Sequence, residues 1–170
     1  MKKPHSHSVV LFIDSSLVIN AVDNKVYLLS KTLSKDTDIE LRALLADIAQ
    51  EANRTELALM VSSSISELFE MLSGYVKQSS CELEIVDNDL GINDFRIHLT
   101  VPDTFPRGYS EALRIHAQNY VVTSVVRKWL YSVLPAMAEQ YDARLLEEYD
   151  SISSLMQSRT RMPSIKPTVL

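Results

Sequence analysis

The sequence predicts a mainly α protein, a helical bundle of four to five helices with one inserted β-hairpin at about residues 81 to 101. Apolar residues recur at three- and four-residue spacing through most of the chain, and one central segment alternates with a period of two. Only three glycines occur among 170 residues, which favours helices over glycine-dependent loops. We expect one domain at residues 1 to 158 and an extended C-terminal arm at residues 159 to 170.

The segment YSEALRIHAQNYVVTSVVRKWLYSVL, residues 109 to 134, predicts the central helix because apolar positions cover most of its circumference. Ser110 is a candidate N-cap, and Pro135 ends the helix because it disfavours helical dihedrals at Leu134. One stripe comprises Leu113, Ala117, Tyr120, Val121, Ser124 and Val125, and the adjoining stripe comprises Val122, Val126, Trp129, Leu130 and Val133.

The N-terminal half predicts a short strand or extended lead-in at residues 9 to 13 and then three helices. Asp14 begins an N-cap cluster for a first helix at residues 15 to 33. A second helix is expected at residues 39 to 52, and a third from Asn53 or Thr55 to about Gly74. The expected buried stripe of the first helix comprises Leu17, Val18, Ala21, Val22, Val26, Leu29 and Leu33.

Two further patterns define the C-terminal half. Apolar and polar residues alternate at Cys81 to Ile85 and again at Phe95 to Val101, which predicts the hairpin. Pro135 suits the first turn of a last helix, residues 135 to 159, antiparallel to the central one. Its expected seam comprises Ala138, Tyr141, Leu145, Tyr149, Ile152 and Met156.

Composition excludes several classes of function. A net charge of -5 and a pI near 5.3 disfavour general nucleic-acid binding. The single Cys81 supports neither an internal disulfide nor a zinc cluster. Apolar runs are too short for a membrane span or a secretory signal, so a cytoplasmic location in the producing cell is expected.

Candidate chemical motifs have simpler structural interpretations. The tip Asp87, Asn88, Asp89, Leu90, Gly91 resembles a calcium loop, but its glycine falls one place early and His98 stands where the bidentate Glu is required. His5, His7, His98 and His116 show no metal-ligand spacing. The sequence therefore predicts no metal and no cofactor. We expect His98 to lie on the wet, solvent-exposed face of its strand.

No pattern of nucleophile and base predicts catalysis. The serines at 62, 63, 64 and 66 lie in a predicted helix interior, where hydroxyls bond back to carbonyls. Cys81 lacks a basic neighbour, which indicates a small core residue. The acids of the last helix, Glu139, Asp142, Glu147, Glu148 and Asp150, are interpreted as a solvated face. The sequence predicts a protein that is not an enzyme.

The segment FRIHLTVPDTFPRGYSEALRIHAQNYVVTSVVRKWLYSVLPAMAEQYDARLLEEYDSI resembles small virion proteins of tailed phages and of prophages in gut bacteria. The resemblance rests on the strand FRIHLTVP, the helix NYVVTSVVRKWLYSVLP and the closing helix MAEQYDARLLEEY, and is best over residues 81 to 156. It is similar to the head–tail connector, or head-completion, family of helical ring proteins. The chain departs from it in its acidic charge and its basic arm.

The resemblance implies a non-enzymatic neck subunit that links portal and tail in the virion, assembled in the bacterial cytoplasm as a homo-oligomeric ring of about twelve copies. Neither a membrane nor a specific nucleic acid is an expected partner. A ring needs two different contact faces on each subunit, which the hairpin tip and the arm could supply. The alternative is a cytoplasmic helical regulator or adaptor that binds a protein or small ligand between helices. The expected interface comprises Asp87, Asn88, Asp89, Leu90, Ile92, Asn93, Arg159, Arg161, Met162, Ile165, Lys166, Val169 and Leu170.

Overall fold

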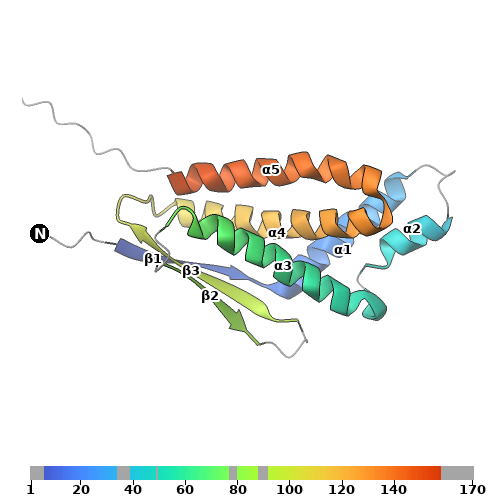
Figure 1. Cartoon of the computed structure of the whole chain (residues 1–170), viewed down its shortest axis with the longest axis horizontal. Coiled ribbons are helices and arrows are strands. Elements are labelled where there is room, and N and C mark those ends of the chain that lie inside the picture. The colour runs from blue at the N-terminus through green and yellow to red at the C-terminus, as the bar shows by residue number, and fades with distance from the viewer. Residues whose placement is uncertain (1–5, 34–38, 49, 77–79, 88–91, 158–170) are drawn as a thin grey trace, which may run out of the picture.

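The computed structural model describes residues 6–33, 39–48, 50–76, 80–87 and 92–157, and it confirms the predicted fold class: a mainly helical protein with a small antiparallel sheet (Figure 1). The predicted arm at residues 159 to 170 lies outside the described residues. In chain order the elements are β1 (Ser6–Ile13), α1 (Ser15–Thr32), α2 (Ile39–Ala46), a 3₁₀ turn (Glu51–Asn53), α3 (Arg54–Ser73), β2 (Cys81–Val86), β3 (Asp94–Pro102), α4 (Tyr109–Val133) and α5 (Pro135–Gln157).

Helix α4 is the centre of the molecule, as its apolar circumference predicts. It packs against α1, α2, α3, α5 and strand β1. Every residue from Tyr120 to Val126 is buried, including Thr123 and Ser124, so two turns of the helix have no solvent-facing side. In Figure 1, α4 lies between α5 and the sheet, which gives the protein three layers.

The N-terminal segment is a full strand of the sheet, which the sequence left open as a short strand or a lead-in. Strand β1 spans eight residues and pairs antiparallel with β3, giving the strand order β1-β3-β2. Val9, Leu11 and Ile13 are 0–4% exposed, whereas Val10 and Phe12 are 48% and 40% exposed. One face of the sheet therefore carries the helices and the other faces solvent, because successive side chains of a strand point to opposite faces.

The second helix is shorter than predicted. The expected helix at residues 39 to 52 ends at Ala46, and a 3₁₀ turn follows at Glu51–Asn53. The Asp47 carbonyl accepts hydrogen bonds from the Gln50 backbone N–H (3.1 Å) and from the Asn53 side chain (2.8 Å). Local bonds of this kind compete with the helical ladder, which explains the early end.

Helix ends agree with the sequence at two places and differ at a third. Asp14 caps α1 by accepting from the Leu17 N–H at 3.0 Å, and α4 ends at Val133, directly before Leu134 and the Pro135 that opens α5. Ser110 is not the N-cap of α4, because the helix already begins at Tyr109. Gly108 is the N-cap residue, and it makes no side-chain capping bond. The tight Leu134 junction makes α4 and α5 antiparallel neighbours.

Two residues of the predicted stripes are exposed instead. Leu17 is 53% exposed and Tyr149 is 41% exposed, although both match the helical spacing of their buried neighbours. Fully buried residues lie close to each of them along the helix, at Val18 and Ile152, so periodicity gives the buried face of a helix but not the width of that face. Among the described residues, none of the helices has the combined length and hydropathy of a membrane span.

Candidate functional site

The predicted hairpin-tip interface is partly outside the described residues and partly inside the fold. Asn88, Asp89 and Leu90, with the arm residues Arg159, Arg161, Met162, Ile165, Lys166, Val169 and Leu170, are outside the described residues. Asp87 and Asn93 are exposed, as an interface requires. Ile92 is only 7% exposed, so little of its side chain is available in the isolated subunit, and its place in an interface stays a prediction. It lies in the turn of the hairpin, shortly before β3 begins.

The end of the hairpin next to its turn, where β3 begins, is fixed to the start of α1, and we call this end the hairpin base. The Ser15 backbone N–H donates to Asp94 Oδ1 at 2.8 Å, and the Ser15 hydroxyl donates to the Asn93 carbonyl at 2.5 Å. Ser15 is fully buried, whereas Asn93 is exposed and Asp94 is half-buried, so both bonds are partly buried. These bonds join residues almost eighty positions apart and hold the start of β3 against the start of α1.

An apolar surface lies between this anchored base and α3. A shallow depression of about 200 Å³ is lined by Thr55, Ala58, Leu59, Ser62, Ile92, Asn93 and Phe95. Leu59 is 67% exposed and Ile85, which pairs with Phe95 across the two strands, is 62% exposed. We call the surface formed by the exposed Leu59 and Ile85, with the buried Ile92 and Phe95 beneath it, the hairpin-base patch. Leu59 lines the depression and Ile85 pairs with Phe95, which also lines it, so the patch is a candidate protein contact surface.

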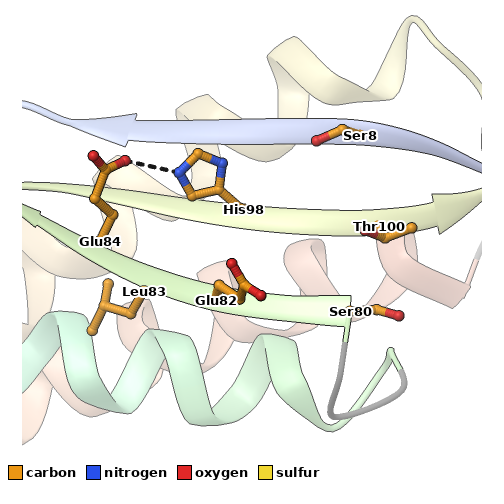
Figure 2. A pocket seen from close by; sticks show the side chains of 7 residues that line it. All are labelled: Ser8, Ser80, Glu82, Leu83, Glu84, His98 and Thr100. Atoms are coloured by element: carbon orange, nitrogen blue, oxygen red, sulfur yellow. Dashed lines mark hydrogen bonds and ion pairs between the residues drawn. The ribbon is translucent and has the colours of Figure 1, made fainter.

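The open face of the sheet carries a polar cluster (Figure 2). His98 and Glu84 lie side by side with Nε2 and Oε2 at 2.9 Å, and Arg96 Nη1 lies 3.4 Å from the other Glu84 oxygen. The hydrogen bond to His98, with the charge of Arg96, lowers the pKa of Glu84 below its ordinary value. His98 thus occupies the wet face of its strand, as predicted.

This cluster borders a depression of about 480 Å³ whose other lining residues are Ser8, Ser80, Glu82, Leu83 and Thr100. Binding sites for small molecules are mainly apolar and bury most of the ligand. This depression is lined chiefly by hydroxyl and carboxylate groups, and Glu84 and His98 are both more than a third exposed. Glu84 and His98 bond to each other in this solvent-exposed depression, which disfavours an enclosed ligand site.

A second polar network joins α3 to α4. Lys128 Nζ lies 2.9 Å from Glu67 Oε1 and 3.0 Å from the Ser63 hydroxyl, and Ser124 donates to Glu67 Oε2 at 3.2 Å. Ser64 and Ser124 are fully buried, and the Ser64 and Ser66 hydroxyls bond back to the carbonyls of Met60 and Ser62, as expected. Glu67 neutralises the charge of Lys128, so the network is typical of polar contacts that hold two packed helices together.

A third cluster lies where α1, α4 and α5 meet. His116 Nδ1 is 2.7 Å from Glu148 Oε2, and burial, with the charge of Arg144, lowers the pKa of Lys25. The sequence predicts that Glu148 lies on a solvated face. Its side chain is only 22% exposed, so this prediction is wrong for Glu148. Asp142 also departs from that interpretation, since it accepts from Arg127 and Tyr131.

Cysteine and metal chemistry can be assessed within the described ranges. Burial raises the pKa of the Cys81 thiol to about 11, so the thiol is protonated at neutral pH, consistent with a small core residue. Across residues 6–157, apart from the gaps given above, no three His, Cys, Asp or Glu side chains come together as a metal-binding group.

Sequence patterns alone did not identify the hairpin-base patch, because it combines a helix position, Leu59, with hairpin positions roughly thirty residues away. Comparisons with protein-family models, with curated proteins and with solved structures find no match to this chain. The arrangement of its own residues is therefore what bears on function.

Proposed function

We propose that this protein is a non-enzymatic structural subunit that works by assembly, as a neck or head–tail connector subunit of a tailed-phage virion. In this proposal copies of the chain form a homo-oligomeric ring, and the hairpin and arm contact neighbouring subunits, the portal, the tail or other neck proteins. The family and the ring come from the sequence resemblance.

The hairpin-base patch is the observation that carries the proposal. Leu59 and Ile85 expose more than three fifths of their surface, although α3 and β2 also supply buried side chains to the core. Each Å² of apolar surface removed from water contributes about 25 cal/mol of favourable free energy, so covering the patch with a neighbouring protein would stabilise the complex. The patch adjoins the hairpin tip, where the sequence predicts an intersubunit contact.

Anchoring of the hairpin supports the same function. The two hydrogen bonds from Ser15 hold the base of the hairpin against α1, so the patch is presented on a fixed support. Preorganised surfaces lose less conformational entropy on association. Of the three depressions described in the structure, the largest is polar and the apolar ones measure about 200 Å³, below the usual range for small-ligand pockets. The adaptor alternative with a small ligand is therefore less favoured.

The test compares two exposed leucines by sedimentation velocity over a range of concentrations. Leu59→Asp places a charge in the patch, and Leu28→Asp places the same charge on α1, where Leu28 is 61% exposed. We expect the wild type and L28D to form oligomers and L59D to remain monomeric, since a buried unpaired charge opposes association. A wild type that is monomeric throughout, or equal assembly of L59D and L28D, would contradict the proposal.

A further inference from the structure

We propose that residues 163–169 of one copy add to the sheet of a second copy, as a fourth strand along the open edge of β2. This inference rests on the proposed function, since it requires that copies of the chain associate. It assigns a specific surface and a specific partner segment to that association.

The backbone of β2 leaves one side available. Strand β2 pairs with β3 on one side, and within the described residues no strand pairs with it on the other. Six consecutive residues, Cys81–Val86, therefore form a strand at the end of the sheet. Such a strand presents N–H and C=O groups that another extended segment can pair with.

The side chains of β2 specify what that segment must look like. On the solvent face, Glu82 and Glu84 are exposed and acidic. On the helix face, Leu83 is half-buried and Ile85 is 62% exposed. Glu82 makes no ion pair with any described residue. A complementary strand would carry apolar side chains on one face and at least one cation on the other.

The arm has this pattern. From Pro163 to Val169 the sequence reads PSIKPTV, in which apolar and polar residues alternate strictly. Ile165 and Val169 share one face with the two prolines, and Lys166 lies on the other with Ser164 and Thr168. Placed beside β2, the apolar row would shield Leu83 and Ile85 while Lys166 faces Glu82 and Glu84.

The two prolines fit this arrangement and limit it. Pro163 and Pro167 are four residues apart, so both lie on the same side of an extended strand. If that side points away from β2, neither missing N–H costs a hydrogen bond, and Ser164, Lys166 and Thr168 supply the N–H groups that face β2. The outer side then lacks donors at two positions, which would stop the sheet from adding a further strand.

The reach of the arm favours a second copy over the chain's own sheet. Helix α5 ends at Gln157 on the far side of α4 from the sheet (Figure 1), so the arm of the same chain would have to cross two layers, each about 10 Å thick, to reach β2. The stretch from Gln157 to Pro163 spans about 20 Å when fully extended. A stretch of this length is too short to pass around α3 as well, which packs on the helix face beside β2. The arm of a neighbouring copy has no such restriction.

Adjacent proline substitutions in the full chain test the pairing. Thr168→Pro removes an N–H that faces β2, whereas Val169→Pro removes one that faces away. Sedimentation velocity should show assembly weakened about tenfold in T168P and nearly unchanged in V169P, since only the first loses an intersubunit hydrogen bond. Amide exchange in β2 should become faster in T168P at a concentration where the wild type assembles.

The outcomes separate this inference from the proposed function. Equal assembly of T168P and V169P with a wild type that still oligomerises would overturn the strand pairing and leave the assembly function standing. A monomeric wild type would overturn both. Faster β2 exchange in T168P with unchanged assembly would place the arm on its own subunit and would also overturn the inference. As a further check, a labelled peptide of residues 159–170 should bind wild type more tightly than Glu82→Lys, with a difference that salt reduces.

Discussion

Strands β1 and β2 flank the same central strand, yet the inward-facing end of β1 is buried and that of β2 is exposed to solvent. Ile13 on β1 and Ile85 on β2 both pair with Phe95 of β3, and they are 1% and 62% exposed. Helix α4 packs on β1, whereas α3 covers β2 only in part. The same residue type in the same row of one sheet therefore stabilises the subunit on one side and is available for contact on the other.

The largest expected effect comes from truncating these two isoleucines. Ile13→Ala should destabilise the chain by about 3 kcal/mol, because it removes a fully buried side chain and leaves a cavity. Ile85→Ala should cost less than about 1 kcal/mol, since most of its side chain is in water in the isolated subunit. Urea unfolding of dilute, monomeric samples measures both, and equal losses would contradict the difference between the two edges.

A second difference lies within β2 and concerns reactivity. Cys81 at its start is 6% exposed, and burial raises the thiol pKa from an ordinary value of 9.0 to about 11. Two pKa units leave about 100-fold less thiolate near neutral pH, so alkylation by iodoacetamide should be much slower than in the urea-unfolded chain. The neutral thiol favours folding below pH 9.0, and that contribution is lost as pH rises through about 11. Mass spectrometry follows the reaction; equal rates in folded and unfolded chain would show that this end of β2 is open as well.

Loosening the hairpin base should have an intermediate effect. Ser15→Ala removes the hydroxyl that donates to the Asn93 carbonyl and should cost about 1–2 kcal/mol, since it leaves a polar group without its partner. Oligomers should weaken at the same time, because the hairpin-base patch loses its support. Ser66→Ala, which removes an exposed hydroxyl bond within α3, is the matched control. Loss of stability without any change in assembly would separate the anchor from the contact surface.

The smallest expected effect is electrostatic and confined to the open face. The bond to His98 lowers the pKa of Glu84, so its contribution to stability is present above the ordinary value of 4.5 and is lost as pH falls through the lowered pKa. Glu84→Gln should therefore be slightly less stable than wild type at pH 7 and equal to it in acid. Glu82→Gln, which removes an exposed carboxylate, should track wild type at both pH values. The midpoints of urea unfolding measure these stabilities at both pH values. A loss of stability in Glu84→Gln that persists in acid would contradict an origin in the bond between Glu84 and His98.

The helical part of the fold could be predicted because its signals are local. The two apolar stripes of residues 109 to 134, the Asp14 cap and the break at Pro135 each depend on residues within a few turns of one another. Pairing of β1 with β3 depends on residues about ninety positions apart, so the N-terminal segment could be recognised as extended but not assigned a partner.

The candidate site was predicted only in outline, for the same reason. Alternation in the hairpin gives the face on which Ile85 lies, but its exposure depends on how far α3 extends over β2. Ile92 follows a turn-rich sequence and is expected in the interface, yet it is only 7% exposed and lines the same depression as Phe95 and residues of α3. The patch exists because Leu59 lines the same depression as Phe95, the strand partner of Ile85, and no local pattern encodes that arrangement.

Amide hydrogen exchange measured on β1 and β2 in the same samples tests the central claim most directly. The chain is compared at a dilute, monomeric concentration and at one where it assembles. Our account predicts that protection of the β2 amides rises with concentration while that of the β1 amides stays constant. Protection that rises in β1, or in neither strand once oligomers have formed, would contradict it.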